Sequence, residues 1–356
     1  MICREPFRWQ DRYLVAQDRS LQPGCSWSNL ARESDKWHLH SKRQRSLGKL
    51  RRAGFSQVAA IIRGYMKLAI LLLAIFSRAG QAAEALSVFH PSGVHSEYGV
   101  TSEVEFSTPL MELESGTLAH HLPAAMKNLR FEEPVWVIGY KASIVDTQGK
   151  TPRENYLCHT FLADQRVDQH PENELKGFYS DAFTPEVRLP DGFGILFSPN
   201  DSLHWMPMFN NRGDQPVRVA MKVALTLIRG KDLKKPLQPL YASLRSVQVP
   251  HLFFVPRGRD ERTVTFTLPF EASIHFLGTH LHPYGASVEL FNISRNELVW
   301  EGRRTGGPES PMEVYSSVKG YAIHAGETFR IKAIYDNPAE EKIDAMAGLF
   351  MLYARR

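Results

Sequence analysis

The sequence predicts an all-β protein that consists of two tandem antiparallel β-sandwich domains of the jelly-roll type. From about residue 86 onward, short segments rich in β-branched and aromatic residues follow one another at roughly even spacing. Clusters of Asn, Asp, Gly and Pro separate these segments, as expected of turns between strands. Many short strands without intervening long helices favour sandwich folds over α/β folds. With 356 residues, the chain is long enough for two such domains.

The first predicted domain spans residues 86–230. Its clearest strand is Val135–Val145, where β-branched and aromatic side chains alternate loosely with polar ones. Further strands are predicted at Asn155–Leu162, Gly194–Phe197, Leu203–Phe209 and Val217–Ile228. The polar, proline-containing segment Lys231–Pro239 follows them, and we interpret it as the link between the domains.

The second predicted domain spans residues 240–356 and repeats the same strand-and-turn pattern. Its strands are predicted at Arg262–Leu268, Ile274–His282, Ser287–Asn292, Glu297–Glu301, Thr328–Tyr335 and Met346–Ala354.

The basic charge of the chain is concentrated before the predicted fold. Residues 1–85 contain 15 of the 43 Lys and Arg but only 6 of the 38 Asp and Glu. The remainder therefore has 28 basic and 32 acidic residues, a net charge of about −4. A mildly acidic body gives no reason to expect nucleic acid as a partner.

A leader signal explains this distribution. Met66 and Lys67 precede the apolar run Leu68–Phe76, and small residues dominate positions 79–85. This order predicts a signal peptide over residues 66–85 and makes residues 1–65 an upstream extension outside the fold. The apolar run is shorter than the ~20 residues of a membrane span. We expect export to the periplasm or the medium, without stable membrane insertion after cleavage; the alternative is a signal anchor with a basic cytoplasmic arm.

Cys158 is the single cysteine after the leader, since Cys3 and Cys25 both precede Met66. An exported protein with one cysteine has no intrachain disulfide. The thiol is therefore either buried and inert or used for a task such as metal ligation.

His280 and His282 form an H-x-H pair near the end of a predicted strand. Residues i and i+2 of a strand point to the same face, so both imidazoles could bind one metal ion. Pro283 and Gly285 end the strand and place the pair at the rim of the sheet. The last strand adds the thioether of Met346, and two imidazoles with a thioether favour copper, because the thioether is a soft ligand. The alternatives are a polar strand face and a methionine in the core.

Four segments together resemble the copper type II, ascorbate-dependent monooxygenases, which include peptidylglycine α-hydroxylating monooxygenase and dopamine β-monooxygenase. The segments occur in order and have the sequences WVIGY at 136–140, YLCHTFL at 156–162, GTHLHPYG at 278–285 and DAMAGLFMLY at 344–353. The resemblance covers about residues 130–354. It implies that His280, His282 and Met346 bind the catalytic copper of an enzyme that hydroxylates a C–H bond with O₂ and an external reductant such as ascorbate.

The first copper site of that family is altered in this chain. The family has a His-His pair where this chain has Cys158 and His159. The family's third imidazole corresponds best to Met208, and His204 lies four residues earlier with the same strand parity. The resemblance therefore leaves two interpretations open. A softer electron-transfer copper could bind Cys158, His159 and either His204 or Met208, or this site has been lost.

Three functional hypotheses follow. The first is an exported copper monooxygenase acting on an unidentified small-molecule or peptide substrate. The second is a copper-binding or copper-handling protein on the same scaffold, without catalysis, which the altered first site motivates. The third is a β-sandwich recognition module without a metal.

Overall fold

A computed structural model describes residues 83–164, 175–248 and 251–356, all of which belong to one compact unit. The upstream extension and the predicted signal peptide up to residue 82 lie outside the described residues, whereas Glu84 and Ala85, at the end of the predicted peptide, belong to strand β1. The described chain is built from β-strands, with one short 3-10 turn at Pro123–Ala125. The all-β prediction is confirmed. Among the described residues, no helix is long and apolar enough to span a membrane.

The N-terminal half forms two sheets. The first has the order β1-β6-β12-β8-β9, with β5 added beside β12. Its strands are β1 (Glu84–Leu86), β5 (Thr117–His121), β6 (Lys127–Phe131), β8 (Leu157–Asp164), β9 (Gly177–Asp181) and β12 (Leu203–Asn211). We call it the inner N-sheet.

The second sheet of this half has the order β14-β11-β7-β13-β3-β2, with β10 beside β7 and β4 beside β13. We call it the outer N-sheet. Its strands are β2 (His90–Pro91), β3 (Gly99–Ser107), β4 (Met111–Leu113), β7 (Val135–Asp146), β10 (Glu186–Arg188), β11 (Phe193–Phe197), β13 (Val217–Leu233) and β14 (Gln238–Pro239).

The C-terminal half contains two four-stranded sheets and a two-stranded ribbon. The inner C-sheet has the order β15-β24-β18-β21, from β15 (Tyr241–Ser246), β18 (Ala272–Leu281), β21 (Tyr315–Ile323) and β24 (Ala347–Arg355). The outer C-sheet has the order β17-β22-β19-β20, from β17 (Gly258–Leu268), β19 (Gly285–Asn292), β20 (Glu297–Arg303) and β22 (Glu327–Asn337). The ribbon pairs β16 (Phe253–Val255) with β23 (Ile343–Ala345).

The two halves meet near Leu240. β14 still pairs with β11 of the outer N-sheet, whereas β15 pairs with β24 of the inner C-sheet. The predicted linker is therefore partly strand, because β13 continues to Leu233 and β14 begins at Gln238. The predicted strands all occur, with ends that differ by a few residues, as is usual for strand boundaries.

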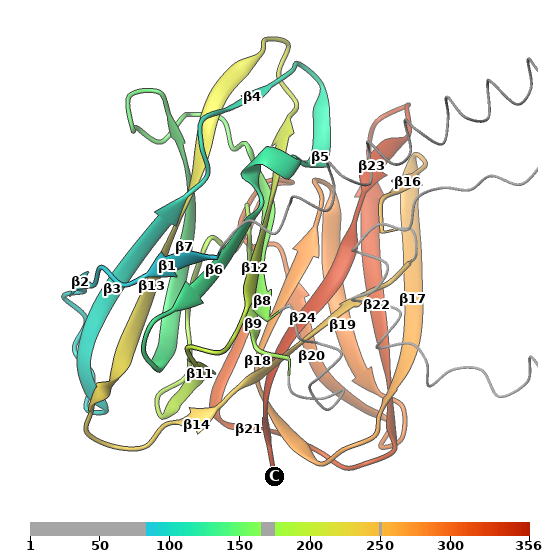
Figure 1. The fold of residues 1–356 in the computed structure, drawn as a ribbon. Coiled ribbons are helices and arrows are strands. Elements are labelled where there is room, and N and C mark those ends of the chain that lie inside the picture. Colours follow the sequence, from blue (N-terminus) through green and yellow to red (C-terminus); the bar gives the residue numbers. More distant parts are fainter. Residues whose placement is uncertain (1–82, 165–174, 249–250) are drawn as a thin grey trace, which may run out of the picture. The chain divides into compact units, whose positions relative to one another are not determined.

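The inner C-sheet is buried on both faces. In β24, Phe350 and Leu352 belong to the hydrophobic core of the N-terminal half, while Leu349 and Met351 belong to the core of the C-terminal half. Successive residues of a strand point to opposite faces, so one strand supplies both cores. The four sheets follow one another across Figure 1, from β3 and β13, through β12 and β8, then β24 and β18, to β22 and β17. Contacts of His280 in β18 with Cys158 in β8 and Asp181 in β9 join the two inner sheets.

Candidate metal centre

A β-bulge in β8 turns Cys158 and His159 toward each other. Met208 of β12 lies opposite His159, but the next residue, Phe209, lies opposite Leu157, so Cys158 is an extra residue in β8. Neighbouring residues of a regular strand point to opposite faces, and a bulge removes that constraint. The Cys158 Sγ accordingly lies 3.4 Å from the His159 Nδ1.

The H-x-H pair lies at the end of β18, as its sequence predicts. The His280 and His282 rings have centroids 5.2 Å apart and are nearly perpendicular. Tyr284, with φ of 68°, then turns the chain in a conformation that L-residues adopt rarely. The side chain of Arg304 donates to the carbonyl oxygens of Leu281 and His282 at 3.0 and 2.8 Å, which fixes the strand end.

Cys158, His280 and His282 form one cluster. The Cys158 Sγ lies 4.0 Å from the His280 Nε2 and 3.8 Å from the His282 Nε2, and the three donor atoms lie within 4.8 Å of one another. All three residues are buried, with exposed fractions of 4%, 6% and 3%. Within the part of the chain that the structure describes, this is the one group of three or more His, Cys, Asp or Glu residues that could hold a metal ion.

The spacing of these atoms fits a three-coordinate ion. Bonds of about 2.3 Å to sulfur and about 2.0–2.1 Å to nitrogen, separated by 120°, require sulfur–nitrogen distances of about 3.8 Å. The two distances in the cluster are 3.8 and 4.0 Å. The cluster could therefore bind a metal ion with little movement of its side chains.

Two carboxylates orient the imidazoles. The His280 Nδ1 lies 3.1 Å from the Asp181 Oδ2, and the His282 Nδ1 lies 2.6 Å from the Asp344 Oδ2. A carboxylate beside Nδ1 accepts its proton and leaves the Nε2 lone pair available, as in carboxylate–histidine–metal arrangements. Both Nε2 atoms are the ones that approach Cys158, so the tautomers inferred from these contacts suit metal binding.

Each carboxylate is held by further donors. Asp181 accepts hydrogen bonds from the Tyr179 hydroxyl at 2.9 Å and from the backbone amides of Phe183 and Thr184 at 2.9 and 2.7 Å. Asp344 accepts two from the guanidinium of Arg212, at 2.8 and 2.7 Å. Asp181 is thus fixed by buried groups of the N-terminal half, and Asp344 by an arginine at the surface.

Burial sets the protonation of the donors. It raises the pKa of the Cys158 thiol well above its usual range, and the charge of Asp181 adds to the effect. Burial also lowers the pKa of His282 to about 4, despite the hydrogen bond to Asp344. The imidazole of His282 is therefore neutral near pH 7, while the thiol keeps its proton until a cation replaces it.

The remaining predicted ligands lie at different distances from the cluster. The ring of His159 lies 4.8 Å from that of His280, measured between centroids. Met208 is buried directly opposite His159. Met346 is half-buried, and its carbonyl oxygen accepts from the His282 amide at 3.4 Å. Met346 occupies the break between β23 and β24, and the pairing of Leu281 with Ala347 brings its backbone next to His282.

His204 lies away from these residues. It is four positions from Met208 along β12, about 13 Å at the usual rise of a strand. Its Nδ1 lies 2.9 Å from the Asn128 Oδ1. The structure thus joins Cys158 to the H-x-H pair and separates His204 from it, whereas the resemblance divides Cys158 and the pair between two copper sites.

Sequence reasoning missed the residues that surround the ligands. Asp181, Arg212 and Tyr335 belong to no motif, and only the fold brings them to the cluster. The Tyr335 hydroxyl accepts from the His282 amide at 3.1 Å and donates to the Met346 carbonyl oxygen at 2.5 Å. For Asp344 the sequence did hold a signal, since it lies two residues before the predicted ligand Met346.

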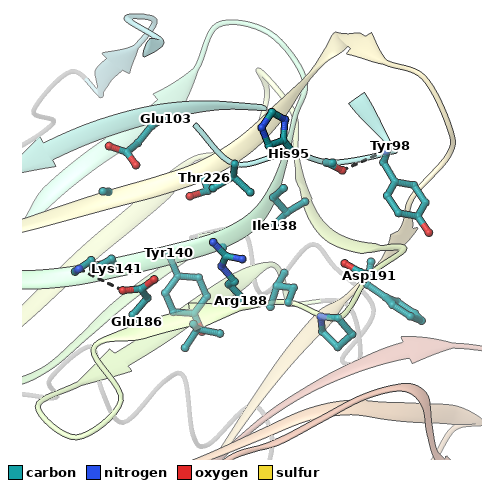
Figure 2. A pocket seen from close by; sticks show the side chains of 18 of the residues that line it. His95, Tyr98, Glu103, Ile138, Tyr140, Lys141, Glu186, Arg188, Asp191 and Thr226 are labelled. Atoms are coloured by element: carbon teal, nitrogen blue, oxygen red, sulfur yellow. Dashed lines mark hydrogen bonds and ion pairs between the residues drawn. The ribbon is translucent and has the colours of Figure 1, made fainter. Parts of the chain in front are cut away.

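A cavity of about 680 Å³ opens elsewhere, on the outer N-sheet (Figure 2). Charged side chains on its walls pair with one another, as Lys141 does with Glu186 at 3.2 Å and Lys222 with Glu105 at 2.8 Å. Cys158, His280 and His282 do not line it. The cavity is therefore separate from the candidate metal centre.

Comparisons with known proteins give no family for the chain. No protein-family model matches it, and neither does any curated protein. Among solved structures, a peptide-N(4)-(N-acetyl-β-D-glucosaminyl) asparagine amidase is similar at 9% identity, with 69% of this chain and 97% of that chain covered and a TM-score of 0.36. The major capsid protein P2 of bacteriophage PM2 is similar at 8% identity, with 68% and 96% covered and a TM-score of 0.31. Likenesses this distant carry no argument about function.

Proposed function

We propose that the protein binds one copper ion through the Cys158 thiolate and the Nε2 atoms of His280 and His282, and that it serves as a copper-binding or copper-handling protein. The observation that carries this proposal is the convergence of one sulfur and two imidazole nitrogens at 3.8–4.0 Å between the two halves of the chain.

The donor set supports copper over harder cations. A thiolate and imidazoles suit copper and zinc, whereas calcium and magnesium prefer oxygen ligands. A trigonal group of two His and one Cys with a distant Met is a known copper arrangement. The Met346 carbonyl oxygen accepts from the His282 amide, so Met346 is the candidate for that thioether. Copper bound there would supply a one-electron redox centre.

The surrounding residues prepare the centre. Asp181 and Asp344 keep the imidazoles turned with Nε2 toward Cys158. The two inner sheets exclude water from the three ligands, which are all buried. The Cys158 proton leaves when a cation binds, because burial makes an uncompensated thiolate unfavourable there.

Copper stoichiometry tests the proposal. The purified protein, loaded with Cu(I) under anaerobic conditions and desalted, is expected to retain one copper per chain by elemental analysis. The double variant His280→Ala/His282→Ala should retain less than a tenth of that amount. His204→Ala is the matched control, since it removes an imidazole outside the cluster and should keep one copper. Equal copper in the double variant and the unsubstituted protein would refute the proposal, as would zinc displacing copper at equal concentration.

A second candidate function is the exported copper monooxygenase that the sequence resembles. It is favoured by the position of Met346, whose carbonyl oxygen accepts from the His282 amide of the H-x-H pair. The copper-loaded protein would then consume O₂ with ascorbate in the presence of a C–H substrate, a small molecule or a peptide. A panel of such substrates without O₂ uptake above that of the double variant would argue against it.

A further inference from the structure

The cluster is closed on one side and reaches the surface on the other. Behind His280, Asp181 is fully buried, and the ring of Tyr179, whose hydroxyl donates to Asp181, lies 5.7 Å from that of Phe350, measured between centroids. Behind His282, Asp344 has an exposed side-chain fraction of 8%, and its partner Arg212 one of 37%. Among the described residues, Arg212 and Asp344 therefore mark a route from solvent to His282.

Arg212 covers this route with its side chain. It follows the last residue of β12, and its two terminal nitrogens donate to Asp344 at 2.8 and 2.7 Å. The Nη2 atom also lies 3.5 Å from the His282 Nδ1. The guanidinium is therefore the outermost group above a ligand imidazole, and it joins the N-terminal half to β23 of the C-terminal half.

The backbone beneath Arg212 is fixed independently. The Asn211 side chain donates to the carbonyl oxygens of Leu113, Glu114 and Gln215 at 2.9–3.1 Å and accepts from the Gly213 amide at 3.0 Å. The Arg212 side chain can therefore rotate away from Asp344 while the loop keeps its conformation. A rotation of this kind in a half-exposed side chain takes place without unfolding of the sheet.

We propose that the Arg212–Asp344 ion pair is a gate that controls how fast the metal exchanges at the Cys158/His280/His282 centre. This inference rests on the proposed function. With the pair formed, a guanidinium blocks the route and its positive charge opposes an approaching cation. With Arg212 rotated outward, Asp344 still holds His282 and adds a carboxylate to the open route.

On the opposite side, the described residues are more closely packed. The guanidinium of Arg304 lies 4.2 Å above the Phe183 ring and is bonded to the carbonyl oxygens at the end of β18. β18 and β24 are buried along their lengths except for the last residue of β24. Exchange through this side would require the inner sheets to separate.

Copper transfer kinetics test the gate. The Cu(I)-loaded protein is mixed with excess bathocuproine disulfonate, and the rate of chelator absorbance is recorded for the unsubstituted protein, Arg212→Ala and Arg212→Lys. We expect at least a tenfold faster transfer from Arg212→Ala, with one copper per chain retained before mixing. Arg212→Lys should lie between them, because an ammonium keeps the charge but lacks the planar fork that matches both carboxylate oxygens.

Arg295→Ala is the matched control, because Arg295 makes a similar two-atom pair with Glu327 in the outer C-sheet. Its transfer rate should stay within twofold of the unsubstituted protein. A rate for Arg212→Ala within twofold of the unsubstituted protein would overturn the gate while leaving copper binding intact, and so would equal acceleration in the control. If Arg212→Ala does not fold, as judged by thermal unfolding, the rate for Arg212→Lys decides. Lack of copper in the unsubstituted protein would overturn the proposed function, and the gate with it.

Discussion

The two imidazoles of the cluster are oriented by the same chemical group in opposite surroundings. Asp181, which holds His280, is completely buried and bonded to a tyrosine and two backbone amides. Asp344, which holds His282, is bonded to a surface arginine. The comparison separates two tasks. The Asp181 side is part of the packing between the halves, and the Asp344 side is the part of the centre that solvent can reach.

The largest effect on stability is expected from replacing Asp181, the buried carboxylate. Asp181→Ala leaves the Tyr179 hydroxyl and two backbone amides without an acceptor, and unpaired buried groups are expensive. We expect the free energy of unfolding to fall by about 3–5 kcal/mol, and copper affinity to fall by about 10- to 100-fold. Chemical denaturation and chelator competition measure the two. A loss below 1 kcal/mol would mean that this side is not part of the packing.

A smaller loss of stability is expected from replacing Asp344, the carboxylate near the surface. Asp344→Ala should lower the free energy of unfolding by only about 1–2 kcal/mol. The loss is small because Arg212, once it has lost its partner, can form hydrogen bonds with water. Burial alone would raise the pKa of Asp344, but hydrogen bonds from His282 and Arg212 hold it well below the usual range.

The pH dependence of that loss has a definite sign. A carboxylate with a depressed pKa stabilises the folded state above its unfolded pKa of about 3.9 and loses that contribution as the pH falls below it. The difference between Asp344→Ala and the unsubstituted protein should therefore be full at pH 6 and shrink below about pH 4. Denaturation at several pH values checks this, and a difference that grows on acidification would contradict the assignment.

The third expected effect, the pH dependence of copper affinity, distinguishes the Cys158 thiol from the His282 imidazole. Because burial raises the pKa of Cys158, each copper bound near neutral pH displaces one proton from it. The pKa of His282 is lowered to about 4, so this imidazole releases no proton in that range. Apparent copper affinity should rise about tenfold per pH unit between about pH 6 and 8. Competition titrations at several pH values measure this dependence. A hundredfold rise in affinity per pH unit would show that an imidazole also loses a proton.

Strand positions and the shared face of His280 and His282 followed from the sequence, because both depend on local alternation. The shared face of Cys158 and His159 did not follow, since adjacent strand residues are expected on opposite faces and a bulge has no reliable sequence signal. The roles of Asp181 and Arg212 could not be predicted from the sequence for a different reason. Their positions depend on how the two halves pack, which no local pattern encodes.

The extra residue in β8 makes the centre depend on the number of residues in that strand as well as on the identity of the ligands. Deleting Leu157 would keep every ligand in the sequence, yet it would restore a regular ladder in which Cys158 lies opposite Phe209 and faces away from His280. A chain aligned to this one with each cysteine and histidine matched, but with one residue fewer before the cysteine, could share the fold and lack the centre. In comparing relatives, the length of this strand is as informative as the identity of its ligands.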